Sequence, residues 1–289
     1  MDATTRIEQA LSAVVANAEG PLCPPRLAAA IRYAVFPGGA RIRPRLALAV
    51  AWACGDDAPG VSDAVAASIE LLHCASLVHD DLPCFDDAPI RRGKPSVHKA
   101  FGQRLAVLAG DALIVLAFEA LAHGVATRPE RLAKLTLIVG QSVGMTSGII
   151  AGQAWECEPR IVLADYHRAK TAALFAAASA AGAVAAGADG DSWRTFGERL
   201  GEAYQVADDI RDVAASAEDL GKPIGQDQAH DRPSAARQLG VAGAVERLQE
   251  LVNSAVEAIP ACPGEEDLRN LIRSEVMRLL PKELMRRVA

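Results

Sequence analysis

The chain has 289 residues, of which 51% are hydrophobic, 23% are charged and only 4% are aromatic, and its formal net charge is −6. This balance is typical of a globular protein, and the acidic charge argues against nucleic acid binding, which requires a basic surface. The six cysteines form no CxxC pair, so the sequence predicts neither a zinc site nor a dense disulfide framework. The N-terminus lacks the basic and apolar regions of a signal peptide, and we therefore expect a cytoplasmic protein.

The predicted elements are helices throughout. Apolar residues recur at intervals of three and four, and alanine and leucine, which favour helices, are abundant. Glycine and proline clusters separate the segments, and no repeat or linker interrupts the series. The longest uncharged run, 172–188, is mostly alanine and glycine, which indicates a buried helix and no stable membrane insertion. We expect a single all-α domain over residues 1–289, with helices at 5–18, 26–35, 43–54, 61–82, 104–122, 130–150, 164–187, 192–213, 233–238, 242–258 and 265–279.

The first segment with a possible chemical role is the turn 38–44, with the sequence Gly-Gly-Ala-Arg-Ile-Arg-Pro, which leads into the helix at 43. Glycines let the backbone approach an anion, and the start of a helix favours negative charge. A simple turn between helices would have a similar composition, so this segment alone is weak evidence of an anion site.

An acidic cluster, 79–87, lies at the end of the fourth predicted helix. His73, Asp80 and Asp81 fall on one stripe of that helix. Buried carboxylates are costly unless they are paired or bind a metal. Pro83 lacks an N–H and should end the helix, so that the chain after it curls back from a loop or a distorted turn.

The pair Asp86-Asp87 is followed directly by a basic turn, 91–95, which contains Arg91 and Arg92. Acidic and basic groups side by side suit a metal–diphosphate complex, because carboxylates hold cations and arginines bind phosphate oxygens bidentately. A charged surface loop is the alternative interpretation, and it is weakened by the presence of a second acidic cluster.

That second cluster consists of Asp208, Asp209 and Asp212 on one helix face, with Gln205 one turn earlier. Three carboxylates this close repel one another unless a cation lies among them. Oxygen ligands without cysteine or histidine favour Mg²⁺ over zinc. Taken alone, the cluster would also fit a solvated acidic helix end.

Two further basic positions are Lys170, followed by Thr171 within the predicted helix 164–187, and Lys222 in the glycine-containing stretch 221–227. A lysine on a core helix needs an anionic partner, and a diphosphate would satisfy it.

Together these segments resemble the trans-isoprenyl diphosphate synthases, also called polyprenyl synthetases. DDLPCFD at 80–86 is similar to the family's first Asp-rich motif in its bacterial DDxxxxD spacing, and DDIRD at 208–212 is similar to the second. GGARIRP, HCASLVHDDLP, RRGKPS, AGQAWE, AKT and YQVADDIRD are similar to family blocks in the same order. VFPGGARIRP and HCASLVHDDLP resemble in particular bacterial geranylgeranyl diphosphate synthases of carotenoid and bacteriochlorophyll pathways.

The resemblance implies an isoprenoid-synthase-type helical bundle around a deep central pocket, in which isopentenyl diphosphate condenses head to tail with an allylic diphosphate. It also implies a homodimer and about three Mg²⁺ ions that bridge the allylic diphosphate. The metal ligands that it implies are Asp80, Asp81, Asp86, Asp208, Asp209 and Asp212.

The same resemblance assigns the substrate contacts. Arg91, Lys170 and Lys222 are expected to bind the allylic diphosphate. Arg43, His73 and Arg92 are expected to bind the diphosphate of isopentenyl diphosphate. The catalytic residues that the resemblance implies are Lys170, Thr171, Gln205 and Lys222. The oxygens of Thr171 and Gln205 are expected to face the allylic carbon, and the two lysines the leaving diphosphate.

Product length in this family depends on the floor of the pocket. A bulky aromatic side chain at the position of Ala75 stops the product of related enzymes near fifteen carbons, so the small Ala75 and its neighbour Ser76 imply a deeper pocket and a C20 product. Phe118 is the candidate for the lower floor. Another wall could set the length instead, since discrimination per methylene is modest.

The sequence departs from the family pattern at a few positions. Ala40 stands where the family usually has a lysine that contacts isopentenyl diphosphate, a loss for which Arg41 or Arg43 could compensate. Glu156 replaces the aspartate of the GQxxD block, and Ala88-Pro89 replaces an acidic pair. A farnesyl diphosphate (C15) synthase, a terpene cyclase and a non-catalytic subunit of a heteromeric synthase are the alternatives. The basic C-terminus with Arg286-Arg287 could reach over the site.

Overall fold

The computed structural model describes residues 2–36, 39–159, 168–214 and 235–277, and in this part of the chain helices predominate and strands are almost absent. The all-α prediction is therefore confirmed. The α-helices are α1 (Ala3–Ala18), α2 (Pro25–Val35), α3 (Ile42–Ala53), α4 (Pro59–Asp80), α5 (Val97–Phe101), α6 (Gln103–Gly124), α7 (Pro129–Val143), α8 (Ile149–Trp155), α10 (Ala173–Ala185), α11 (Arg194–Ala214), α14 (Ala235–Glu257) and α15 (Glu265–Met277).

Two short helical turns and a small hairpin complete the described elements. The π-helix η1 (Arg168–Ala172) precedes α10, and the 3₁₀-helix η2 (Asp191–Trp193) precedes α11. The strands β1 (Ile90–Arg91) and β2 (Lys94–Pro95) pair antiparallel. The sequence did not predict this hairpin, because two-residue strands leave no periodic signal.

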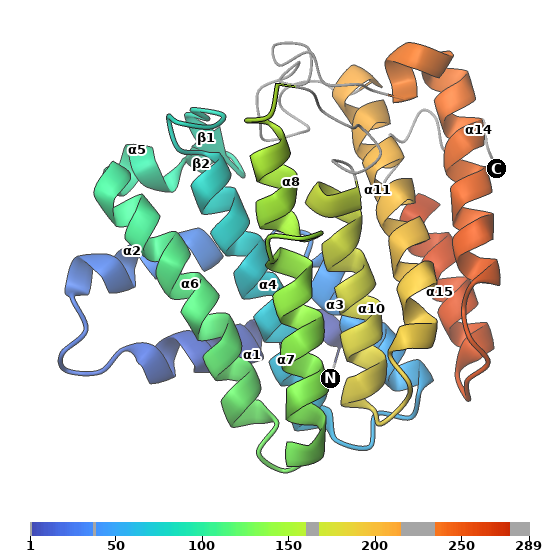
Figure 1. Ribbon diagram of the computed structural model, residues 1–289, viewed down its shortest axis with the longest axis horizontal. Helices are drawn as coiled ribbons and strands as arrows, with labels where there is room; N and C mark the ends of the chain where they lie inside the picture. Colours follow the sequence, from blue (N-terminus) through green and yellow to red (C-terminus); the bar gives the residue numbers. More distant parts are fainter. Residues whose placement is uncertain (1, 37–38, 160–167, 215–234, 278–289) are drawn as a thin grey trace.

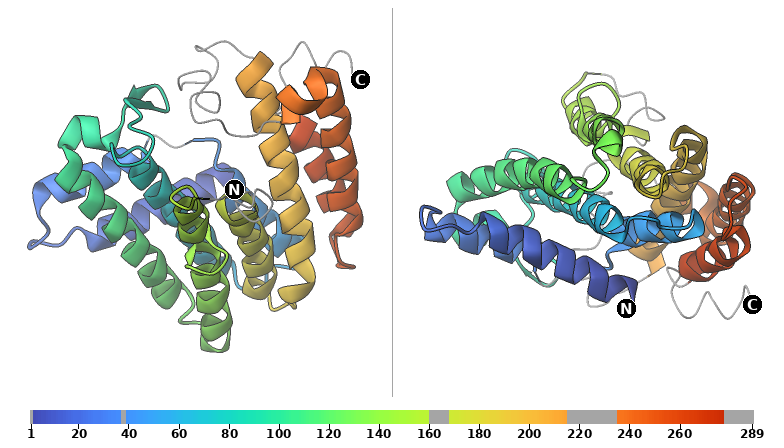
Figure 2. Two further views of the ribbon diagram at one scale, coloured as in Figure 1. Left: turned by 45° about the horizontal axis from the view of Figure 1, so that its top comes forward. Right: turned by 90° about the horizontal axis from the view of Figure 1, so that it is seen from below.

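The long helices run side by side as a bundle, with α4 in its interior (Figure 1). Helix α1 packs on one side of α4 and α6 on another, while α3 and α10 continue the core toward α11 (Figure 2). Most of α4 is buried and rich in small residues, which is why its neighbours can approach from several sides. The bundle therefore surrounds the helix that ends in the first acidic cluster.

Helix α10 shows how the alanine-rich sequence produces close packing. Its residues from Leu174 to Ala185 are all buried. A β-carbon at Gly182 would collide with the backbone oxygen of Ala47 in α3, and one at Gly197 in α11 would collide with Ser179. Most of the run 172–188 thus belongs to the buried helix α10, as predicted.

One predicted helix is wrong in its extent and one predicted break is confirmed. The predicted helix 130–150 ends at Val143 and restarts at Ile149, because Gly144 and Gly148 adopt extended backbone between α7 and α8. The predicted break between helices 233–238 and 242–258 is confirmed, because α14 has a kink at Gly240, whose φ of 71° and ψ of 166° are non-helical. Part of the predicted helix 164–187 lies outside the described residues.

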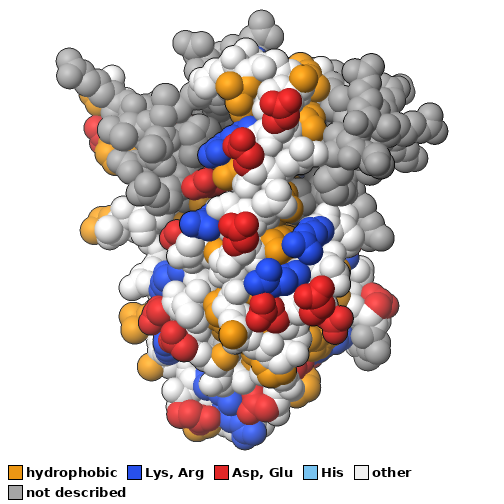
Figure 3. All heavy atoms as spheres, turned by 90° about the vertical axis from the view of Figure 1, so that its right-hand side faces the viewer, with side chains coloured by type: hydrophobic (Ala, Val, Ile, Leu, Met, Phe, Trp, Pro, Cys, Tyr) orange, Lys and Arg blue, Asp and Glu red, His pale blue; other side chains and the backbone are white. Residues whose placement is uncertain are grey.

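Two of the described helices, α4 and α6, are long and apolar enough to cross a membrane by length and composition. The apolar window of α4 is 78% buried in the bundle and that of α6 is 44% buried, so α4 is a core helix and α6 keeps an exposed apolar side. On the face formed by α14 and α15, acidic and basic side chains alternate with apolar ones (Figure 3).

The close contact at Gly182 gives a testable stability prediction. Gly182→Ala should lower the free energy of unfolding by about 1–3 kcal/mol, because the new methyl group meets a backbone oxygen that cannot move without shifting α3. Gly60→Ala is the matched control: Gly60 has open space, and the alanine should raise stability by up to about 1 kcal/mol. Urea unfolding followed by circular dichroism measures both. Equal effects of the two substitutions would contradict this packing.

Candidate active site

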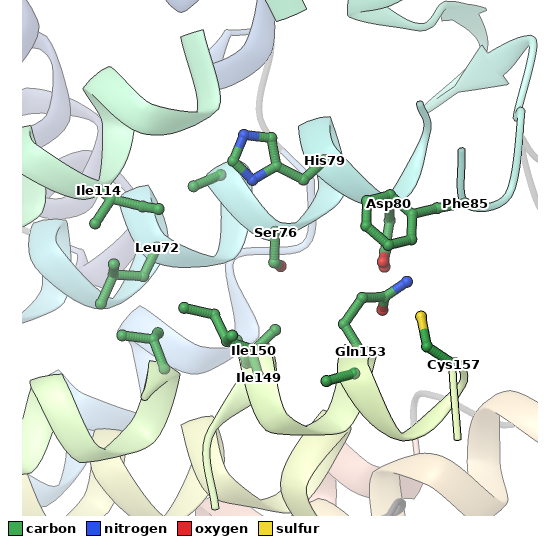
Figure 4. A pocket seen from close by; sticks show the side chains of 13 residues that line it. Leu72, Ser76, His79, Asp80, Phe85, Ile114, Ile149, Ile150, Gln153 and Cys157 are labelled. Atoms are coloured by element: carbon green, nitrogen blue, oxygen red, sulfur yellow. The ribbon is translucent and has the colours of Figure 1, made fainter. Parts of the chain in front are cut away.

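A cavity of about 370 Å³ lies between α4, α6 and α8. Apolar side chains such as Leu72 and Ile114 line one end, and Asp80, Gln153 and Cys157 line the other (Figure 4). A long apolar pocket with polar groups at one end suits a ligand with an apolar tail and a charged head. The full lining is Leu72, Ala75, Ser76, His79, Asp80, Phe85, Ile114, Val143, Ile149, Ile150, Gln153, Ala154 and Cys157.

The polar end is built around Asp80, the last residue of α4. The chain curls back after Pro83, so that the backbone N–H of Asp86 donates to the backbone oxygen of Asp80 at 2.9 Å. Burial raises the pKa of Asp80 to about 6, and the nearby Lys170 ammonium opposes this rise while the carboxylates of Asp86 and Glu156 add to it. Asp80 therefore lies at the polar end of the cavity and close to both Lys170 and Asp86.

Asp81 points elsewhere. Its carboxylate accepts hydrogen bonds from Arg91, with Nε 3.0 Å from Oδ1, and its side chain is buried. Asp81 and Arg91 line a smaller cavity together with Arg92 and Lys94. Burial raises the pKa of Asp81, and the hydrogen bond from Arg91 opposes the rise. In this structure Arg91 and Asp81 are thus each other's partners, although the sequence assigned them separately to diphosphate and metal.

Lys170 lies on η1 and reaches Glu156 at the end of α8, with Nζ 2.6 Å from Oε1. The approach is possible because Gly152 has no side chain: a β-carbon there would lie 2.6 Å from the backbone nitrogen of Lys170. π-Helical turns are rare and often occur at functional sites. The local distortion therefore places the predicted catalytic lysine beside the carboxylates of the first motif.

Thr171, the next residue, belongs to a hydrogen-bonded chain with α11. Its Oγ1 donates to Gln205 Oε1 at 3.0 Å, and Gln205 Nε2 donates to Asp209 Oδ1 at 3.0 Å. Asp209 also accepts from the backbone N–H of Ala235 at 2.8 Å. These three side chains line a cavity of about 250 Å³ bounded by η1, α11 and α14, separate from the cavity at Asp80.

The other carboxylates of the second motif lie on the same helix. Asp208 pairs with Arg211 one turn later. Burial raises the pKa of Asp209, and its hydrogen bonds oppose the rise. Asp212 follows on the next turn of α11 and is partly buried.

The predicted ligands of isopentenyl diphosphate converge on one another. Arg43 Nη1 lies 3.5 Å from His73 Nε2, and the Arg43 guanidinium stacks on the ring of Phe175 at 4.6 Å. Burial, together with Arg43 and Arg92, lowers the pKa of His73 well below its usual value. A neutral histidine near Arg43 and Arg92 leaves the positive charge of both guanidinium groups to a diphosphate.

Arg41 cannot take over the role of the missing lysine at position 40. It is 3% exposed, and its guanidinium is bound to Glu8 at 2.7 Å and to Glu70 at 2.6 Å. The suggestion that Arg41 compensates for Ala40 is therefore wrong, and Arg43 is the remaining candidate.

The residues expected to set product length divide in two. Ala75 and Ser76 line the large cavity, and Ala75 is 2% exposed. Phe118 is not among the lining residues, and Ile114, one turn earlier on α6, takes that place. The role of Phe118 as the lower floor stays a prediction, and the lining of this cavity does not support it.

The donor chemistry of the two acidic clusters fits Mg²⁺, because it consists of carboxylate oxygens alone. Within the part of the chain that the structure describes, no three such groups converge on one point. The predicted metal ligands lie in two groups, one at the end of α4 and one near the end of α11. Lys222 and Arg286-Arg287 lie outside the described residues.

Sequence reasoning missed the α8 side of the large cavity. Ile149, Ile150 and Gln153 come from α8, and Cys157 follows in the turn after it. The predicted helix 130–150 covers only the first two residues of α8, and no helix was predicted over the rest of it. The pair Gly144 and Gly148 was the available signal for the break.

A family model described as polyprenyl synthetase matches residues 24–265. The chain belongs to this family. It is 54% identical to the geranylgeranyl diphosphate synthase of Cereibacter sphaeroides over 98% of each chain, and 52% identical to that of Rhodobacter capsulatus over 94% of each chain. This polyprenyl synthetase is also 38% identical to the farnesyl diphosphate synthase of Geobacillus stearothermophilus over 86% of each chain.

Among solved structures, this polyprenyl synthetase is similar to the geranyltransferase of Helicobacter pylori complexed with magnesium and isoprenyl diphosphate. The TM-score is 0.81 and the identity 32%, over 95% of this chain and 96% of the other. The chain therefore has an isoprenoid-synthase-type helical fold and is a prenyltransferase.

Proposed function

We propose that this polyprenyl synthetase condenses isopentenyl diphosphate with allylic diphosphates in the presence of Mg²⁺ and releases geranylgeranyl diphosphate, C20. The observation that carries the proposal is the large apolar cavity that starts at Asp80 and continues past the small Ala75 toward Ile114. The identities of 54% and 52% to geranylgeranyl diphosphate synthases support it.

In the proposed reaction the allylic diphosphate lies at the mouth of the cavity with its tail inside. Asp80, Asp81, Asp86, Asp208, Asp209 and Asp212 would hold Mg²⁺, about three ions, which would withdraw charge from the leaving diphosphate. Lys170 and Arg91 would supply further positive charge at the leaving diphosphate. Arg91 would do so by exchanging its contact with Asp81 for one with phosphate. Lys222, which lies outside the described residues, would add a third cation.

The apolar lining excludes water from the allylic cation that forms when the diphosphate leaves. Arg43, His73 and Arg92 hold isopentenyl diphosphate so that its double bond attacks that cation. The hydroxyl of Thr171 and the amide of Gln205 would stabilise the cation after a rearrangement that brings them from their present cavity to the allylic carbon. Loss of a proton to the departed diphosphate completes the step.

A farnesyl diphosphate synthase is the second candidate, favoured only by the 38% identity to one such enzyme. A non-catalytic subunit and a terpene cyclase are less compatible with two intact Asp-rich motifs.

The test is incubation of the purified protein with isopentenyl diphosphate and dimethylallyl, geranyl or farnesyl diphosphate, with Mg²⁺ or with EDTA, followed by identification of the dephosphorylated alcohols. We expect a C20 alcohol that forms only with the metal. A C15 end product would support the second candidate, and the absence of any product would contradict the enzyme activity.

We further propose that the chain is a cytoplasmic homodimer that binds no nucleic acid. Its interface would be the exposed apolar side of α6 and its neighbour α7 (Figure 1), where Leu108, Val115 and Leu137 are 52%, 56% and 63% exposed.

A charge in this surface should separate the subunits. Leu137→Glu should shift the protein to monomer in sedimentation, because a buried unpaired carboxylate disfavours the interface. The control is Leu239→Glu on α14, which makes the same change at a position that is 54% exposed and should leave the dimer intact. A dimer unaffected by Leu137→Glu would contradict this interface.

A further inference from the structure

Glu70 is a buried carboxylate in α4 that takes no part in the proposed reaction steps. It is 1% exposed, and its Oε1 accepts from Arg41 Nη1 at 2.6 Å and lies 3.8 Å from Arg92 Nη2. The thiol of Cys74, one turn later, lies 3.9 Å from the same oxygen. Because a buried carboxylate is costly without cations nearby, Glu70 and the two guanidinium groups form one charge cluster.

The two arginines come from separate turns, and both turns need external support. Arg41 precedes α3 with φ of 50°, and Arg92 lies between β1 and β2 with φ of 53°. Residues with a β-carbon keep this left-handed conformation only where surrounding contacts enforce it. Glu70 supplies such a contact to both turns, since it attracts both side chains to α4.

Only one of the two arginines is also placed to meet a ligand. Arg41 accepts no such role, because its guanidinium donates to Glu8 at 2.7 Å and to the backbone oxygen of Val35 at 2.9 Å and the residue is buried. The side chain of Arg92 is 21% exposed and lies near His73, whose pKa it helps to lower.

Arg92 also packs against the turn before α3, where a β-carbon on Gly39 would lie 2.9 Å from its Nε. Arg43 follows this turn and contacts His73 at 3.5 Å. Arg92 is thus close both to Glu70 and to the Arg43–His73 pair.

We propose that Glu70 is a positioning residue for isopentenyl diphosphate, which holds the Arg92 guanidinium where it meets that diphosphate together with Arg43. The inference rests on the proposed function. Ala40 supplies no cation and Arg41 is engaged elsewhere. Arg43 and Arg92 therefore carry a large share of the positive charge for this substrate, and the orientation of Arg92 matters accordingly.

Glu70→Gln tests the proposal, because it keeps the shape of the side chain and removes its charge. We expect the KM for isopentenyl diphosphate to rise about ten-fold, the effect of weakening one charge-assisted contact. The KM for farnesyl diphosphate and kcat should change less than about two-fold, because neither depends on Arg92. Calorimetric titration with isopentenyl diphosphate should show the same loss of affinity independently of turnover.

Glu8→Gln is the matched control. It removes a carboxylate from Arg41 without touching Arg92, so both KM values should stay unchanged. Glu70→Asp, which keeps the charge with a shorter reach, should give an intermediate KM, and circular dichroism identifies any variant that fails to fold.

A double-mutant cycle with Arg92→Ala decides the mechanism. If Glu70 acts through Arg92, Glu70→Gln should have no further effect on isopentenyl diphosphate binding in that background. An equal factor in both backgrounds, an equal effect of Glu8→Gln, or a loss confined to kcat would overturn the proposal. A wild-type protein that binds the substrate but forms no product would contradict the proposed function and leave the calorimetric test decisive for Glu70.

Discussion

Asp80→Asn should lower kcat about a thousand-fold or more and leave the fold intact. The substitution removes a charged oxygen from the group expected to hold Mg²⁺ at the leaving diphosphate, where it is worth about 4 kcal/mol of transition-state stabilisation. Steady-state kinetics with farnesyl and isopentenyl diphosphate measures this loss. Asp189→Asn is the control, since Asp189 is an exposed carboxylate that pairs with Lys134 far from the cavity, and its loss should leave kcat unchanged.

The same substitution should stabilise the metal-free protein. The pKa of Asp80 is raised to about 6, above its ordinary value of 3.8, so the folded state holds the proton more tightly than the unfolded state. The ionised carboxylate therefore lowers stability as pH rises from about 4 to 6, and this cost is fully present above pH 6. Asn should remove it, giving a gain in unfolding free energy that is absent near pH 4 and constant above pH 6. A variant that keeps full activity, or one that is less stable at pH 7, would contradict this role of Asp80.

Ala75→Tyr should change the main product from C20 to C15. Ala75 is buried and lines the cavity five residues before Asp80, so a phenol ring there would occupy the space that the growing tail needs beyond fifteen carbons. A methylene that does not fit costs about 1–3 kcal/mol, and a whole five-carbon unit costs more. Chromatography of the dephosphorylated alcohols should show C20 falling to less than about a tenth of the product.

Two further variants keep this prediction decisive. Ala75→Ser adds little volume and should retain the C20 product. Ser76→Phe narrows the same cavity from the neighbouring residue and should shorten the product even if Tyr at position 75 overpacks the helix, which costs about 1–3 kcal/mol. An active Ala75→Tyr enzyme that still makes mainly C20 would contradict Ala75 as a determinant of length.

Much of the fold follows from local patterns. The apolar periodicity of α4 and α11 and the breakers between helices are short-range features, and they predicted a helical bundle with an acidic cluster near the end of each of these helices. The resemblance in the Asp-rich motifs added the family, which the match over residues 24–265 bears out.

The arrangement of the side chains did not follow from those patterns. Asp80 and Asp81 point about 100° apart by helix geometry. That one lines the apolar cavity and the other binds Arg91 depends on the elements packed around α4. The ion pair between Arg41 and Glu70 joins residues 29 positions apart. The π-helical turn at Lys170 depends on the absence of a side chain at Gly152. Such features arise from tertiary packing and leave no periodic signal.

The depth of the large cavity is the central claim, and a single turnover tests it most directly. The protein would be present in molar excess over farnesyl diphosphate and would be mixed with it, radiolabelled isopentenyl diphosphate and Mg²⁺. The labelled products would then be separated by chain length. The cavity past Ala75 predicts one addition, giving labelled C20 and no longer chain. Unreacted farnesyl diphosphate from a protein that extends geranyl diphosphate, or continued addition beyond C20, would contradict it.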